Sequence, residues 1–269
     1  MRIGYQLYSA RADAERDLKS TLLAIKHMGY DGVELAGLYG RTADEFRQVL
    51  RETGVDAVSA HVPLKDICAD MFKTISDYKH IGCRYVAVPY TDAECRPGGP
   101  KFAETLFAFS RFGRLCREAG MHLLYHNHDF EFEKLSGIYG LDFIYAAVDS
   151  RLIQTEIDTC WVKYAGEDPS AYVRKYAGRA PIVHLKDFVG TKGDKSPYAL
   201  IGMADDAARD PNAFEFRPVG YGCQNFVDII EAAKAAGAEW VIVEQDDSTA
   251  RTPLEDAKLS IEYLKSIGL

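Results

Sequence analysis

The sequence predicts an α/β protein that folds as a single-domain (β/α)8 TIM barrel over residues 1–269. Short apolar runs, most of them introduced by a helix end and a glycine, alternate with helical patterns along the whole chain. Such alternation favours a parallel sheet, either closed or doubly wound. Eight strand-like runs within 269 residues favour closure, because this is the usual length of one barrel.

The recurring join consists of the polar end of a helix, a glycine and a run dense in apolar residues. Glycine suits the left-handed residue that closes a helix, and a basic residue lies near that end each time. The apolar runs lack the polar alternation of a sheet with one wet face, which is typical of parallel strands covered on both sides. The join occurs at residues 26–35, 51–60, 79–88, 117–126 and 234–243.

In chain order, the apolar runs predict strands at residues 2–8, 31–36, 55–61, 84–90, 121–128, 152–158, 181–186 and 240–245. Helical patterns fill the intervals, for example at 14–28, 41–53, 66–81, 101–119, 168–178, 223–236 and 254–266. The interval 187–222 differs because it is rich in Gly, Pro and Asp. In a barrel it follows a strand on the catalytic face, where we expect it to act as a lid.

The overall charge excludes two classes of partner. The formal net charge is −8 and the pI about 5.4, and an acidic surface repels both nucleic acid and anionic lipid. No apolar run approaches 18 residues, no signal-peptide pattern opens the chain, and the six cysteines form no CxxC pair. We therefore expect a cytoplasmic protein with free thiols and a small-molecule partner; a homo-oligomer remains open.

Four consecutive predicted strands end in potential metal ligands instead of apolar residues. A period of two places these side chains on a shared face in pairs: His126 with His128, Glu156 with Asp158, His184 with Lys186, and Glu244 with Asp246. Neighbouring strands lie about 4.8 Å apart, so four adjacent strand ends can converge on one ion. A mixed imidazole and carboxylate set suits Mn²⁺, Zn²⁺, Co²⁺ or Fe²⁺ better than Ca²⁺. The alternative for any single residue is a capping or ion-pairing role.

These strand ends also carry a family resemblance that spans the whole chain. The segments RIGYQLYS, ELAGLYG, YHNHDFEF, EIDTCWVKYAGEDP, GRAPIVHLKDF and VIVEQD resemble the xylose isomerase-like TIM barrels, the sugar phosphate isomerase/epimerase superfamily. The resemblance implies that Asp158, His184 and Glu244 bind one divalent metal ion. Many members supply a Glu at the position of His126, so the fourth ligand stays open, with His126 as first choice and Glu131 as second.

By the same resemblance, His128 corresponds to the base of dehydratase-like relatives and Lys186 to a substrate-contacting acid. If His128 were instead a metal ligand, Glu156 would be next in line as base. The implied chemistry is proton abstraction next to a carbonyl, through an enediolate that the metal stabilises. We expect a metal-dependent sugar isomerase or epimerase. The alternative is a keto-sugar or keto-inositol lyase or dehydratase, which the HNH variant at residues 126–128 favours.

Four further residues are candidates for substrate binding: His61, Glu34, Trp161 and Arg217. Each has a structural alternative, such as a satisfied core histidine at His61 or packing under the loop for Trp161. A sugar-binding barrel without catalysis is a rival that would need no metal. The apurinic endonuclease branch is disfavoured because Trp161 stands where that branch has a histidine ligand, and no Asp-x-His occurs in 187–222.

Overall fold

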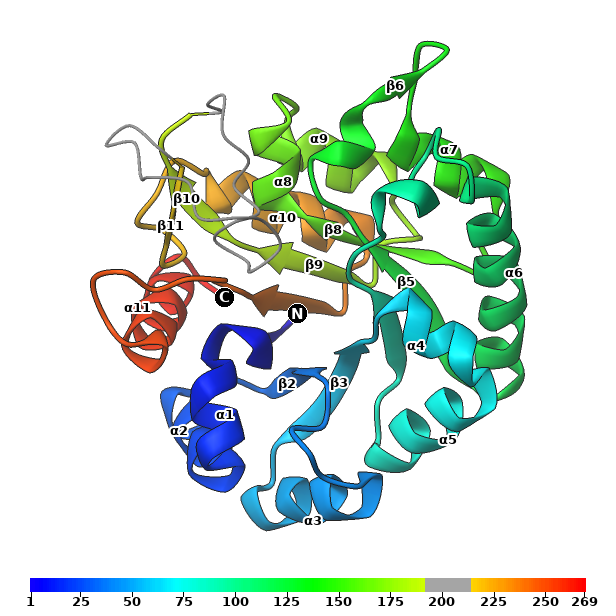
Figure 1. Ribbon diagram of the computed structural model, residues 1–269. Coiled ribbons are helices and arrows are strands. Elements are labelled where there is room, and N and C mark those ends of the chain that lie inside the picture. Colours follow the sequence, from blue (N-terminus) through cyan, green and yellow to red (C-terminus); the bar gives the residue numbers. More distant parts are fainter. Residues whose placement is uncertain (192–213) are drawn as a thin grey trace.

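The computed structural model describes residues 1–191 and 214–269. Eight parallel strands close into a barrel in the order β1-β12-β9-β8-β5-β4-β3-β2, with helices around it (Figure 1). The barrel strands are β1 (Arg2–Gln6), β2 (Gly32–Ala36), β3 (Asp56–His61), β4 (Tyr85–Val88), β5 (His122–His126), β8 (Gln154–Asp158), β9 (Ile182–Leu185) and β12 (Trp240–Val243). Every one lies within a predicted strand range, so the predicted fold class is confirmed.

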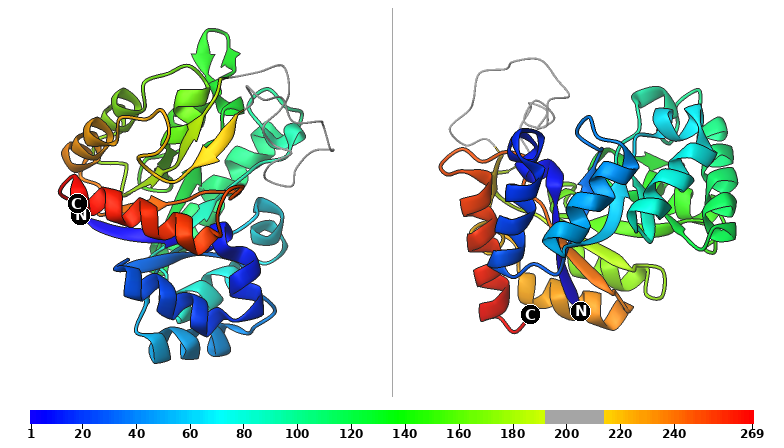
Figure 2. Two further views of the ribbon diagram at one scale, coloured as in Figure 1. Left: turned by 90° about the vertical axis from the view of Figure 1, so that its left-hand side faces the viewer. Right: turned by 90° about the horizontal axis from the view of Figure 1, so that it is seen from below.

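The helices are α1 (Arg11–Arg16), α2 (Leu18–Met28), α3 (Ala43–Thr53), α4 (Leu64–Ala69), α5 (Met71–Ile81), α6 (Phe102–Glu118), α7 (Gly140–Ala147), α8 (Thr159–Tyr164), α9 (Pro169–Lys175), α10 (Phe226–Ala236) and α11 (Pro253–Ser266). Short 3₁₀ turns and a small hairpin, β6 (Lys134–Leu135) with β7 (Ile138–Tyr139), complete the connections. Figure 2 shows the helical shell from two further sides, with the two termini close together.

Two predicted helices, 14–28 and 66–81, are each split in two. Asp17 separates α1 from α2, and its side chain accepts a hydrogen bond from the backbone N–H of Ser20 at 3.0 Å. Asp70 separates α4 from α5 in the same way, accepting from the N–H of Lys73 at 2.9 Å. An aspartate that caps a helix adopts an extended backbone, so one continuous helix cannot pass through it.

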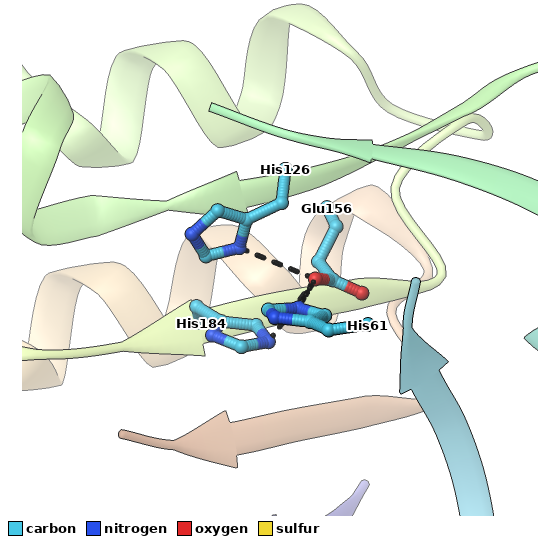
Figure 3. A group of neighbouring side chains, drawn as sticks. All are labelled: His61, His126, Glu156 and His184. Atoms are coloured by element: carbon cyan, nitrogen blue, oxygen red, sulfur yellow. Dashed lines mark hydrogen bonds and ion pairs between the residues drawn. The ribbon is translucent and has the colours of Figure 1, made fainter. Parts of the chain in front are cut away.

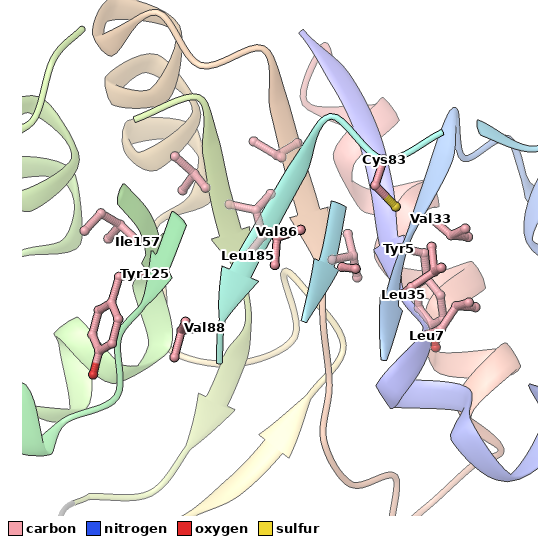
Figure 4. Close-up of a cluster of buried hydrophobic side chains, with 14 of the residues drawn as sticks. Tyr5, Leu7, Val33, Leu35, Cys83, Val86, Val88, Tyr125, Ile157 and Leu185 are labelled. Carbon is pink, nitrogen blue, oxygen red and sulfur yellow. The ribbon is translucent and has the colours of Figure 1, made fainter. Parts of the chain in front are cut away.

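The barrel interior changes from apolar to polar along its axis. An apolar plug fills one part, made of Val58, Tyr85, Ala87, Leu124, Ile182, Trp240 and Ile242. Strand side chains such as Val33, Val86 and Leu185 belong to the main hydrophobic core, part of which Figure 4 draws. Gln6, His61, His126 and His184 come from the first, third, fifth and seventh barrel strands. Alternate strands supply one layer of a TIM barrel, so three imidazoles share a layer.

The interval after β9 forms an antiparallel pair, β10 (Asp187–Val189) with β11 (Glu215–Arg217). The middle of the predicted lid, residues 192–213, lies outside the described residues. Phe188 and Phe216 of this pair form a buried aromatic cluster with Trp161 and Phe214. In the part of the chain that the structure describes, no helix is both long and apolar enough to cross a bilayer.

Candidate metal centre and active site

Four side chains converge at the carboxyl ends of β5, β8, β9 and β12. They are His126, Asp158, His184 and Glu244, and one ligand atom from each lies within 4.8 Å of the others. The parallel register causes this, because Asp158 lies directly opposite His184. All four side chains are buried. We call this set the mouth group; it contains the three ligands expected from the family resemblance and the first choice for the fourth.

A second set, the inner group, lies next to the mouth group and consists of His61, His126, Glu156 and His184 (Figure 3). Oε1 of Glu156 lies 2.7 Å from Nε2 of His61. The same oxygen lies 3.2 Å from Nδ1 of His126 and 3.2 Å from Nε2 of His184. One carboxylate oxygen therefore contacts three imidazoles.

Glu34 supports the inner group from β2. Its Oε2 lies 2.7 Å from Nε2 of His184 and 3.1 Å from Nε2 of His61, and it accepts a hydrogen bond from Nε2 of Gln6 at 2.8 Å. Burial alone would lower the pKa of His61, but Glu34 and Glu156 outweigh it and raise that pKa to about 10. Burial would raise the pKa of Glu34, yet His61 and His184 hold it below its usual range. The inner group thus contains compensated buried charges.

His126 and His184 belong to both groups and use opposite ring nitrogens in each. Nε2 of His126 lies 3.5 Å from Oδ2 of Asp158, while Nδ1 faces Glu156. Nδ1 of His184 lies 3.0 Å from Oε2 of Glu244, while Nε2 faces Glu34 and Glu156. Metal-binding histidines usually donate their second N–H to a carboxylate in this way. Two imidazoles and two carboxylates whose ligand atoms lie within 4.8 Å of one another fit a divalent transition metal at the mouth group.

Lys186 lies among three carboxylates beside the mouth group. Its Nζ is 3.1 Å from Oδ2 of Asp158, 2.9 Å from Oε2 of Glu244 and 2.9 Å from Oδ2 of Asp246. Burial would lower the pKa of Lys186, but these carboxylates outweigh it and hold it well above its ordinary value. Burial raises the pKa of Asp246 to about 7, against the opposing effect of Lys186.

A cavity of about 510 Å³ opens onto this site. Among the residues that line it are His61, His126, His128, Lys186, Glu244 and Asp246. The barrel has another cavity, of about 590 Å³, at its amino-terminal end around Arg2 and Trp240. We assign the chemistry to the smaller one, because the candidate catalytic side chains face it.

His128 is held in the cavity wall by aromatic neighbours. Its ring stacks on Phe130 with planes 3° apart and meets Tyr90 edge-on at 5.5 Å between centroids. Burial, followed by the positive charge of Lys186, lowers the pKa of His128 well below its ordinary value. The imidazole is therefore neutral at physiological pH, which is the form that accepts a proton.

Other predicted site residues lie outside the mouth group. Oε2 of Glu131 accepts the backbone N–H of His128 at 2.8 Å, and Oε1 accepts the Tyr125 hydroxyl at 2.5 Å. Glu131 thus braces the end of β5. Trp161 is fully buried and stacks on Phe214, so its ring packs against the β10–β11 pair; a role in substrate binding stays a prediction.

Arg217 lies on β11, and its guanidinium pairs with Glu215 at 2.5 Å. Glu34 and Glu156 are fully buried in the barrel, whereas His61 belongs both to the inner group and to the cavity wall. Of the four residues expected to bind substrate, His61 is the one that lines the cavity; substrate contact by any of the four stays a prediction.

Sequence reasoning missed two residues that organise the site. The amide of Asn127 accepts the backbone N–H of Asp158 at 3.0 Å and donates to its carbonyl at 3.3 Å, fixing one ligand to the adjoining strand. Asp187 accepts the backbone N–H groups of Gly220, Gly222 and Gln224. A Cβ at Gly222 would lie 2.3 Å from Oδ1 of Asp187, so the GYG segment is a glycine turn around a carboxylate. The alternation of side chains along β5 could have pointed to Asn127, and the glycines of the GYG segment could have pointed to a partner such as Asp187.

The closed parallel barrel, with ligand-type side chains at its carboxyl ends, defines the class of this protein. Residues 22–267 match the family model of the xylose isomerase-like TIM barrel, and the chain belongs to that family. Among solved structures, it is similar to a sugar phosphate isomerase/epimerase from Parabacteroides distasonis, with a TM-score of 0.77, 21% identity and 98% of each chain covered. It also resembles the IOLI protein with a bound zinc atom, with a TM-score of 0.71, 13% identity and 99% and 98% of the two chains covered.

Curated relatives are named for a different reaction from the one expected first. The chain is 26% identical to an inosose dehydratase of Geobacillus kaustophilus, over 90% of this chain and 85% of the relative. It is 29% identical to an inosose dehydratase of Clostridium beijerinckii, over 58% of this chain, and the match spans about half (51%) of that relative. These names favour the dehydratase alternative over the isomerase or epimerase that the sequence led us to expect first.

Proposed function

We propose that this chain is a metal-dependent dehydratase, a lyase that removes water from a small keto-cyclitol or keto-sugar. The observation that carries the proposal is the placement of His128 and Lys186 in one cavity wall with His126 and Glu244 of the mouth group. This joins a neutral base, a permanent cation and a complete ligand set at the carboxyl end of the barrel. The inosose dehydratases among its relatives support the same class of reaction.

The mouth group would hold the ion through His126, Asp158, His184 and Glu244. When bound there, a divalent ion supplies a Lewis acid that polarises a carbonyl or hydroxyl oxygen of the substrate. Glu156 keeps Nδ1 of His126 and Nε2 of His184 turned inward, which leaves the opposite ring nitrogens directed at the mouth.

The neutral imidazole of His128 takes the proton from the carbon next to the carbonyl. Lys186 offers N–H donors and a positive charge to the hydroxyl that departs from the adjacent carbon. The carbon–hydrogen and carbon–oxygen bonds break, a carbon–carbon double bond forms, and hydroxyl and proton leave as water. The buried aromatic wall around His128 limits access of solvent to the base.

Isomerisation or epimerisation at the same site is the second candidate. It shares the first proton abstraction and differs only in returning the proton to carbon, and the Parabacteroides neighbour carries that name. The two reactions are separated by whether a carbon–oxygen bond breaks.

The test uses purified protein, Mn²⁺, and inosose or a panel of keto-sugars in D₂O. We expect loss of water, seen by mass spectrometry, and a primary isotope effect when the reacting carbon carries deuterium. Recovery of an epimer or isomer that has gained solvent deuterium, without loss of water, would favour the second candidate. Turnover without cleavage of any carbon–hydrogen bond would contradict both.

A further inference from the structure

The ammonium of Lys186 touches the same two oxygen atoms that face the candidate metal-binding nitrogens. Oδ2 of Asp158 and Oε2 of Glu244 face His126 and His184, and each also lies within 3.1 Å of Lys186 Nζ. Only 2% of the Lys186 side chain surface is exposed. A dissolved cation could exchange with solvent, whereas the ammonium of Lys186 is part of the chain and stays beside these carboxylates.

When fully ionised, the carboxylates around Lys186 outnumber its single positive charge. Asp158, Glu244 and Asp246 bring three carboxylates, and Lys186 brings one ammonium. The charges of the inner group are compensated with the help of Glu34, since Glu34 and Glu156 face His61 and His184. Burial of uncompensated carboxylates is unfavourable. An ammonium and a divalent ion together would neutralise three carboxylates, so the composition of the site suits the presence of both.

Resting on the proposed metal-dependent function, we propose that Lys186 competes with the divalent ion for Asp158 and Glu244. In metal-free protein the ammonium holds these two carboxylates together. When the ion binds, Lys186 gives up both oxygens and keeps Asp246, which is not a member of the mouth group. Two cations sharing the same pair of oxygens would repel each other strongly at such short range. Lys186 therefore preserves the shape of the site and lowers its affinity for metal.

The test compares Lys186→Met with Lys163→Met, which removes one positive charge from an exposed position on α8. Mn²⁺ dissociation constants are measured by calorimetry after treatment with chelator. We expect Lys186→Met to bind Mn²⁺ at least about tenfold more tightly than wild type, since a like charge close to the ion is gone. Lys163→Met should stay within about twofold, because exposed charges are screened by solvent.

Thermal unfolding supplies a second readout that does not depend on activity. In chelator, Lys186→Met should unfold at a lower temperature than wild type, because three buried carboxylates lose their counter-ion. Its rise in unfolding temperature on adding Mn²⁺ should exceed that of wild type. If Lys186→Met does not fold without metal, Lys186→Gln replaces it in a different measurement. Lys186→Gln is purified with Mn²⁺, and a chromophoric chelator then removes the metal while its colour reports the rate of loss. We expect Lys186→Gln to lose Mn²⁺ more slowly than wild type does.

Unchanged or weaker Mn²⁺ affinity in Lys186→Met, or faster loss of Mn²⁺ from Lys186→Gln, would overturn the proposal that Lys186 competes with the metal. The proposed metal site would still stand. A wild-type protein that binds no Mn²⁺, Zn²⁺, Co²⁺ or Fe²⁺ would overturn the proposed function and this inference together. The two failures are distinguished by the wild-type titration alone.

Discussion

The imidazoles of His126 and His184 lie with their ring centroids 4.7 Å apart and their planes at 80°. Each ring directs one nitrogen to a mouth carboxylate and the other to Oε1 of Glu156. A single buried carboxylate on β8 thus contacts two candidate ligands from the strands on either side of it, β5 and β9. These contacts lead us to propose Glu156 as a positioning residue; the sequence predicts it as next in line as base.

Glu156→Gln should weaken Mn²⁺ binding by about 10- to 100-fold, because loss of a carboxylate behind a metal-binding histidine typically has this effect. The amide also brings a donor toward imidazoles that need an acceptor. Calorimetric titration gives the dissociation constants. Glu118→Gln, at an exposed position on α6, is the matched control and should bind as wild type does. Equal affinity in both variants would refute the positioning role.

Asp158→Ala or Glu244→Ala should abolish metal binding with the fold retained, because each removes a charged ligand of the mouth group. Wild-type protein dialysed against Mn²⁺ should contain about one ion per chain, measured by elemental analysis. Circular dichroism checks the fold, and Glu231→Ala, on the exposed side of α10, is the control. Full metal occupancy in the two site variants would show that the ion is bound elsewhere.

His128→Ala should keep the metal and lose roughly 10²- to 10⁴-fold in turnover, the usual contribution of a general base. His122→Ala, at the start of β5 and at the opposite end of the barrel, tests whether loss of any histidine on or just after β5 has this effect. Steady-state rates are measured beside metal content for each variant. Parallel loss of metal and turnover in His128→Ala would instead make His128 a ligand.

Glu131 should make stability depend on pH. Burial raises its pKa from 4.5 to about 7, so the fold favours the protonated form. Its contribution is therefore fully present below about pH 4.5 and lost as pH rises through about 7, a difference of about 3 kcal/mol. Glu131→Gln cannot undergo this loss. The free energy of unfolding in urea, wild type minus variant, should fall by about that amount between pH 4 and pH 8.

The exposed neighbour Glu133 provides the control for this measurement. Glu133→Gln should leave the pH dependence of unfolding as it is in wild type. A wild-type-minus-Glu131→Gln difference that stays constant across the range would contradict the assignment of Glu131 as a buried acid bracing β5.

The sequence alone determined the eight strands and the residues at their ends. Strand position follows from local signals, apolar runs bounded by glycines and helix ends, and parallel strands bring their carboxyl ends to one side whatever the helices do. Asp158, His184 and Glu244 could therefore be grouped before any contact was known. The breaks at Asp17 and Asp70 were also locally encoded, since both are helix-capping residues inside predicted helices.

Tertiary structure alone decided what each polar side chain contacts across the barrel. Glu156 and Asp158 share one face of β8, yet one contacts the inner imidazoles and the other the mouth, because their levels along the barrel axis differ by two residues. Glu131, three residues beyond His128, turns back to brace β5, and Trp161 packs beneath a loop contributed from after β9. Closure and stagger of the strands set these distances, and both depend on all eight strands at once.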